Sequence, residues 1–337
     1  MNANESYYRK ITGAIGVTML FFLLFINCFG LLHTFLDLIV FTVFPNSPVA
    51  CEVTSEIIYA AGYLSSFMCP VAILRWRLRR TGCEFHPMYA APRVSPWIFL
   101  MIPACVTVVF AAAYINAQMV SFVDYSSFSS EYLWDSVNIS VEPYRMVLDF
   151  IVVCVVPGFC EEFLFRGAIL PNCRPFGRTN AILISSLLFS TMHQNPEQLF
   201  YTFVAGLMLG VIYEKTESIW NCTLIHIFIN FISTYEGWIG TWFEDIFQAS
   251  VYVMLFELAL FIIGILSLFV LIRHFFGKQK TAETGIFGRP LKADDRYAQY
   301  PISSARAVRL FITPSTVAYF AICVLQVLTL FLMALVI

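Results

Sequence analysis

The segment GFCEEFLFRG, residues 158–167, carries three ionisable side chains within an apolar run. An ionisable residue inside a membrane span costs about 2.5–3.5 kcal/mol on insertion scales, so its presence needs a reason. On a helix Glu162 and Arg166 are four residues apart and can pair, whereas Glu161 points about 100° away. The two carboxylates would then have different surroundings, which acid and base chemistry requires. The simpler interpretation is an ion pair at the end of a membrane helix.

The composition of the chain excludes a single water-soluble core. Its 337 residues are 59% hydrophobic and 12% charged, unlike an ordinary soluble domain. A helix needs roughly 20 apolar residues to cross the hydrocarbon layer, and we therefore predict an all-α, polytopic transmembrane bundle of about eight or nine spans. The predicted spans are 11–31, 56–74, 97–120, 146–165, 180–194, 198–213, 218–235, 250–272 and 313–337.

Charge distribution predicts the orientation of the chain. With nine spans and a cytoplasmic N-terminus, Arg145 is the one residue among the 20 lysines and arginines that lies on the outer side, as the positive-inside rule favours. We expect a multi-pass protein of a bacterial cell membrane. The segment Leu32–Phe44 would suit an extension of the first helix, an interfacial piece or a further span. Four regions are predicted: 1–145 with about three spans, a core over 146–235, an additional span in 236–276, and a cytoplasmic linker with a last span in 277–337.

Two further motifs place polar side chains in apolar segments. Phe189 and His193 are four residues apart near the end of the predicted fifth span, and His226 and Asn230 are four apart in the seventh. Residues at this spacing share one face of a helix. Taken singly, His193 would suit a helix-end histidine bonded to a backbone carbonyl, and His226 with Asn230 would suit interhelical hydrogen bonds.

Other polar or small residues in the spans have a simpler explanation or none. Gly206 and Gly210 form a G-x-x-x-G pair, which we assign to close helix packing. Glu257 lies in the eighth predicted span without a partner that the sequence identifies. The ten cysteines contain no C-x-x-C pair, which argues against a disulfide scaffold and a zinc ribbon.

Together the three motifs resemble the signatures of the CAAX protease and bacteriocin-processing (CPBP) family, which includes type II CAAX prenyl endopeptidases and the ABI proteins. They are Glu-Glu-x-x-x-Arg at 161–166, Phe-x-x-x-His at 189–193 and His-x-x-x-Asn at 226–230. The resemblance implies a catalytic core of about four helices around a water-filled cavity. It also implies an intramembrane endopeptidase whose partners are the lipid bilayer and a peptide or protein substrate, prenylated in some members; no nucleic acid is expected.

The resemblance also assigns roles to the motif residues. Glu161 with His193 would activate the water that attacks the peptide bond, while Glu162 and Arg166 would orient Glu161 and tune its charge.

The remaining motif residues would act on the substrate. His226 and Asn230 would donate hydrogen bonds to the tetrahedral oxyanion, and Phe189 would shape the substrate pocket.

A zinc ion is an alternative cofactor. Glu161, His193 and His226 would supply two histidines and one carboxylate with an open water position. The H-E-x-x-H helix is absent, however, and an asparagine beside the second histidine suits an oxyanion hole better than a zinc shell. We therefore favour metal-independent glutamate catalysis over a metalloprotease.

Straight spans do not assemble this site. At 1.5 Å per residue, Glu161 and His226 fall near the inner third of the membrane, whereas His193 lies nearer the outer side. We expect the fifth helix either to start deeper or to tilt. Two other classes of function remain open: a non-proteolytic scaffold, such as a bacteriocin-immunity or sensor-regulating protein, and a proton-coupled transporter.

Overall fold

The computed structural model describes residues 3–86, 94–121, 143–242, 246–276 and 302–336, which form helices and no strands. The all-α prediction is confirmed. The main helices are α1 (Ala3–Val43), α2 (Pro48–Arg80), α3 (Ile98–Val120), α5 (Pro143–Asp149), α6 (Val156–Leu164), α7 (Leu170–Cys173), α8 (Arg178–Thr191), α9 (Pro196–Thr216), α10 (Ile219–Trp242), α11 (Ile246–Phe276), α12 (Ser304–Phe311) and α13 (Pro314–Val336).

The chain is an integral membrane protein with several spans. Among the described residues, five helices are long and apolar enough to cross a membrane: α1, α2, α3, α11 and α13. Every predicted span overlaps a helix or a continuous helical run, so the predicted count agrees with the architecture. The helix at the fifth predicted span, α8, has 14 residues and is about 21 Å long, which is shorter than the hydrocarbon layer.

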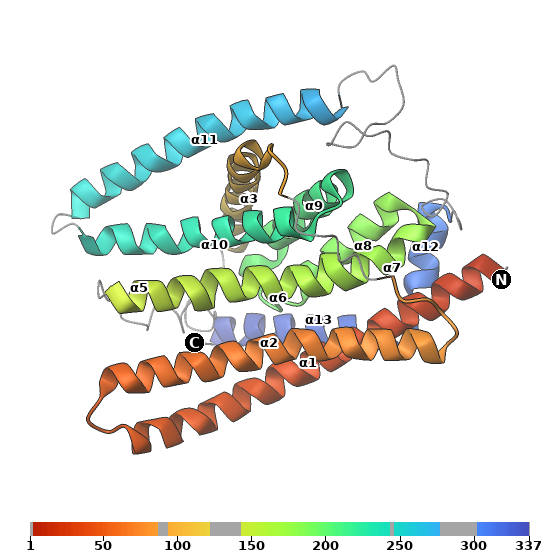
Figure 1. Cartoon of the computed structure of the whole chain (residues 1–337), viewed down its shortest axis with the longest axis horizontal. Coiled ribbons are helices and arrows are strands. Elements are labelled where there is room, and N and C mark those ends of the chain that lie inside the picture. The colour runs from red at the N-terminus through yellow and green to blue at the C-terminus, as the bar shows by residue number, and fades with distance from the viewer. Residues whose placement is uncertain (1–2, 87–93, 122–142, 243–245, 277–301, 337) are drawn as a thin grey trace.

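The first two helices form a long antiparallel pair along one edge of the molecule, with α13 beside α1 (Figure 1). The 41-residue α1 continues to Val43, so the segment Leu32–Phe44 is an extension of the first helix. Helix α11 lies at the opposite edge, against α3 (Figure 1). The run through α5 and α6 lies between these edges, next to α10.

The helix that carries Glu161 is longer than predicted. The helical run is continuous from Pro143 to Phe176. It includes two π-helical segments, η1 (Phe150–Val155) and η2 (Phe165–Ile169), and its last three residues form a 3₁₀ turn. The helix thus continues beyond residue 165, where the predicted span ends, and Arg166 is buried and paired within it. Single π-helical turns occur frequently at functional sites.

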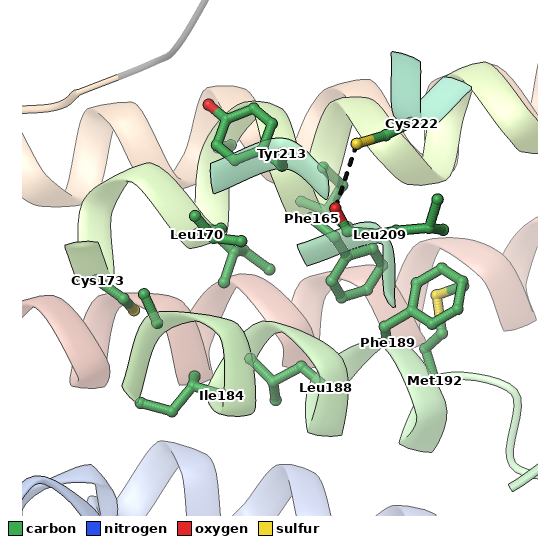
Figure 2. Packing of buried hydrophobic residues seen from close by; sticks show 14 of the residues in the cluster. Phe165, Leu170, Cys173, Ile184, Leu188, Phe189, Met192, Leu209, Tyr213 and Cys222 are labelled. Atoms are coloured by element: carbon green, nitrogen blue, oxygen red, sulfur yellow. Dashed lines mark hydrogen bonds between the residues drawn. The ribbon is translucent and has the colours of Figure 1, made fainter. Parts of the chain in front are cut away.

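The helices α8, α9 and α10 complete the core with the α5–α7 run. Helix α8 packs closely on α9, where a Cβ at Gly206 would lie 2.9 Å from Cα of Ser186, so the G-x-x-x-G pair acts in packing as expected. Figure 2 shows the apolar interior between these helices, where Phe165 and Phe189 lie close together and the Cys222 thiol donates to the Leu209 carbonyl.

The predicted linker is partly helical. Most of it, 277–301, lies outside the described residues, but α12 (Ser304–Phe311) falls within its C-terminal end and packs against α1. Arg306 of α12 makes two hydrogen bonds to the carboxylate of Glu5, at 2.7 and 3.0 Å. Helix α12, which directly precedes α13, is therefore bonded to the first turn of α1.

Candidate active site

Glu162 is the centre of a buried polar network. Its Oε1 atom accepts a hydrogen bond from Nη1 of Arg166 at 2.8 Å and lies 3.0 Å from Nδ1 of His226. Glu162 and Arg166 are both 0% exposed, which rules out the interpretation as an ion pair at the surface end of a helix. A carboxylate can only accept, so Nδ1 of His226 carries the hydrogen.

Arg166 is held from two further sides. Its Nη2 atom donates to the carbonyl of Gly206 on α9 at 3.1 Å, and its guanidinium carbon lies 4.6 Å from the centre of the Phe189 ring. The carbonyl, the carboxylate and the aromatic face all favour a cation. The network therefore links the α5–α7 run to α8, α9 and α10.

Glu161 has different surroundings, as the sequence predicted. Its Oε1 atom accepts a hydrogen bond from the Tyr63 hydroxyl at 2.6 Å, and its Oε2 atom lies 3.9 Å from Nε2 of His226. Oε2 is buried and has no hydrogen-bond partner among the described residues. The imidazole of His226 thus lies between the two carboxylates, with one ring nitrogen toward each.

Close contact between α6 and α10 makes this arrangement possible. A Cβ at Gly158 would lie 2.7 Å from a side-chain carbon of Ile227 and 3.2 Å from its backbone nitrogen. Only a glycine leaves room for α10 at this point. Because Ile227 follows His226, the close approach brings the imidazole to the two glutamates one turn away on α6.

Phe189 connects the two histidines. The centre of its ring lies 5.4 Å from that of His193 and 5.8 Å from that of His226, both edge-to-face. Nδ1 of His193 lies 2.9 Å from the Phe189 carbonyl. That nitrogen therefore carries a hydrogen, and in the neutral form of the ring Nε2 is the acceptor. His193 thus makes the backbone contact expected for a lone histidine and also lies beside the cluster.

The positions of two helix ends explain how Glu161 and His193 lie at a similar depth. Arg174 and Arg178 both contact Glu214, at 2.9 and 3.6 Å, so the run before α8 and the start of α8 lie at one level. Glu161 lies 13 residues before Arg174, and His193 lies 15 residues after Arg178, or about 20 and 22 Å along their helices. The short α8 therefore ends at the depth of Glu161.

Asn230 lies one turn beyond His226 and is half-buried. Its Nδ2 atom donates to the Val153 carbonyl in η1 at 3.2 Å. In the second π-helical segment, the Phe165 carbonyl accepts a hydrogen bond from the Ser185 hydroxyl at 3.3 Å. Side chains of neighbouring helices therefore bond to a carbonyl in each π-helical segment.

Comparison with known protein families identifies this region. Residues 143–232 match the family model described as type II CAAX prenyl endopeptidase, Rce1-like. This part of the chain is similar to that CAAX protease family. No curated protein matches the chain. No solved structure matches it either.

The matched CAAX protease segment contains all seven residues predicted for the site. Six of them gather around Glu162 and Phe189 as described above, and Asn230 lies at the edge of this group, bonded to η1. The match covers about a quarter of the chain. The helices α1, α2, α3, α11, α12 and α13 lie outside it.

The predicted zinc ligands of this CAAX protease segment do not form a metal site. Among the residues that the structure describes, no three histidine, cysteine, aspartate or glutamate side chains lie close enough together to hold a metal ion. Nδ1 of each histidine is bonded to protein, as it is in most zinc-ligating histidines. The spacing of the three side chains is therefore what does not fit a zinc site.

Tyr63 is a site residue that sequence reasoning missed. It lies on α2, outside the CAAX protease match and 98 residues before Glu161. A weak signal exists, because Tyr59, Tyr63 and Phe67 recur every four residues on one face of an apolar helix. That pattern is more typical of helix packing than of catalysis, and only the tertiary contact distinguishes the two.

Proposed function

We propose that this protein is an intramembrane endopeptidase that hydrolyses peptide bonds in membrane-associated or prenylated substrates without a metal ion. The observation that carries the proposal is the buried pair Glu161–His226, in which Oε2 of Glu161 lies 3.9 Å from Nε2 of His226 and has no hydrogen-bond partner among the described residues. A carboxylate inside an apolar bundle costs free energy, and its presence there therefore favours a functional role. An oxygen with no donor bound to it is free to take a proton.

In the proposed reaction, Glu161 acts as the general base. A water molecule attacks the carbonyl carbon of the scissile peptide bond while Glu161 takes a proton from that water. Nε2 of His193 holds the same water, because its lone pair accepts a hydrogen bond. The bond to the amide nitrogen then breaks, and the proton on Glu161 passes to the leaving amine.

Oxyanion stabilisation comes from α10 in this proposal. His226 donates through Nε2, which requires the doubly protonated ring, with Glu162 accepting from Nδ1. The second Nδ2 hydrogen of Asn230 supplies a further donor while the first remains bonded to Val153. Glu162 and Arg166 hold His226 in place and keep the local charge balanced.

The proposed type of substrate is supported by the family model, whose description contains the words CAAX prenyl endopeptidase. We propose that a lipid-modified peptide reaches the site from the bilayer, between the apolar helices. A prenyl group would partition into the bilayer with about 0.8 kcal/mol for each buried CH₂, and so would concentrate the peptide near the site.

The decisive experiment compares two glutamate variants of purified protein in detergent, with a fluorescence-quenched prenylated peptide as substrate. Glu161→Gln should lose activity by at least about 100-fold, because the amide cannot take a proton. Glu257→Gln is the matched control, since Glu257 is an exposed glutamate on α11 and its loss should leave activity unchanged. Undiminished cleavage by Glu161→Gln would overturn the proposal, as would a wild-type protein inactive on prenylated and unmodified peptides alike.

A further inference from the structure

Tyr63 lies within hydrogen-bonding distance of the proposed base, although it belongs to a helix outside the matched segment. Its hydroxyl donates to Oε1 of Glu161 at 2.6 Å, while Oε2 of the same carboxylate has no hydrogen-bond partner among the described residues. The two oxygens of Glu161 are therefore distinguished by the protein. One is fixed by a neutral donor, and the other faces His226 at 3.9 Å.

The phenol of Tyr63 is held in a ladder of rings along α2. The Tyr63 ring lies 5.9 Å from that of Tyr59 and 4.9 Å from that of Phe67. Phe67 in turn lies 4.9 Å from Phe22 on α1, and both of these phenylalanines are buried. Since an aromatic side chain has only two rotatable angles, such packing fixes the position of its hydroxyl at little entropic cost.

We propose that Tyr63 is a positioning residue for Glu161: it binds Oε1, fixes the rotation of the carboxylate, and directs Oε2 toward the water and substrate. The α1–α2 pair is then part of the active site and not only a membrane anchor. This inference rests on the proposed function of Glu161 as general base. Its chemistry is simple, because a hydroxyl donor stabilises the ionised carboxylate that a base needs at the start of the reaction.

A purely structural role for Tyr63 makes different predictions. If the hydroxyl only satisfies a buried oxygen, its removal lowers stability and leaves kcat and KM of the folded enzyme unchanged. If Tyr63 positions the base, its removal lowers kcat and leaves KM unchanged, because substrate binding does not depend on the rotation of the carboxylate.

The test is Tyr63→Phe, which keeps the ring and its contacts with Tyr59 and Phe67. We expect kcat to fall about tenfold and KM to stay unchanged. Tyr8→Phe is the matched control. Tyr8 is a fully buried tyrosine whose hydroxyl has no hydrogen-bond partner among the described residues and whose ring packs on Phe176. It should keep the wild-type kcat and KM.

A second readout separates this inference from the proposed function. Infrared difference spectra of protein with ¹³C-labelled glutamate, with Glu161→Gln as reference, report the hydrogen bonding of the Glu161 carboxylate whether or not it catalyses. An unchanged carboxylate band and an unchanged kcat in Tyr63→Phe would overturn the inference while an inactive Glu161→Gln still supported the protease. An active Glu161→Gln would overturn the protease, and the carboxylate band alone would then decide whether Tyr63 positions Glu161.

Discussion

Nδ1 of His226 lies 3.0 Å from Oε1 of Glu162. The same oxygen accepts the hydrogen bond from Arg166, so a single carboxylate atom holds an imidazole and a guanidinium inside an apolar bundle. Because all three groups are buried, each depends strongly on the others.

Arg166→Met should destabilise the protein by about 3–5 kcal/mol, because Glu162 would keep a buried charge without its main counter-ion. The double variant with Glu162→Gln should be less unstable than the sum of the two single variants. Chemical unfolding in detergent of the four proteins gives the coupling energy. Strict additivity would show that the two residues do not act as a pair.

Phe189→Leu should lower kcat about tenfold with little change in KM. Leucine keeps much of the apolar volume but removes the ring face under Arg166, an interaction worth about 2 kcal/mol when desolvated, and removes the edge contacts with both histidines. Steady-state cleavage of a prenylated peptide measures the effect. Phe176→Leu, a buried ring packed on Tyr8, is the control, and equal losses in both variants would contradict a specific role for Phe189.

Asn230→Leu should lower kcat by about 10²–10³ if the amide donates to the oxyanion, with KM nearly unchanged. The comparison is Ser185→Ala, which removes the side-chain hydrogen bond to the Phe165 carbonyl in the other π-helical segment. Both variants should lose some thermal stability. Should Asn230→Leu lose stability but retain its turnover, Asn230 would only support η1.

Gly206→Ala should destabilise the protein by about 1–3 kcal/mol, because the added methyl group would meet the backbone of Ser186 at 2.9 Å and force α8 away from α9. Activity should fall as well, since the Gly206 carbonyl accepts from Arg166. Gly30→Ala is the control, as no atom lies within 4 Å of the position of its new Cβ. Thermal unfolding that ranks the two variants equally would contradict this close approach.

Much of the local chemistry follows from residue spacing. The pairing of Glu162 with Arg166, the shared face of Phe189 and His193, and the close packing at Gly206 were all predicted and are present. Each depends on a separation of four residues or on the absence of a side chain, and a helix converts both into geometry without help from the rest of the chain.

The sequence by itself determined that this chain is a helical membrane protein, because apolar runs of sufficient length have no other stable arrangement in lipid. It also determined which polar residues belong to the motif. Tertiary structure decided how deep Glu161 and His193 lie, since that depends on where helices end and on π-helical turns. It also decided that Tyr63, 98 residues away, reaches Glu161, because a contact between distant helices follows from how their whole surfaces pack.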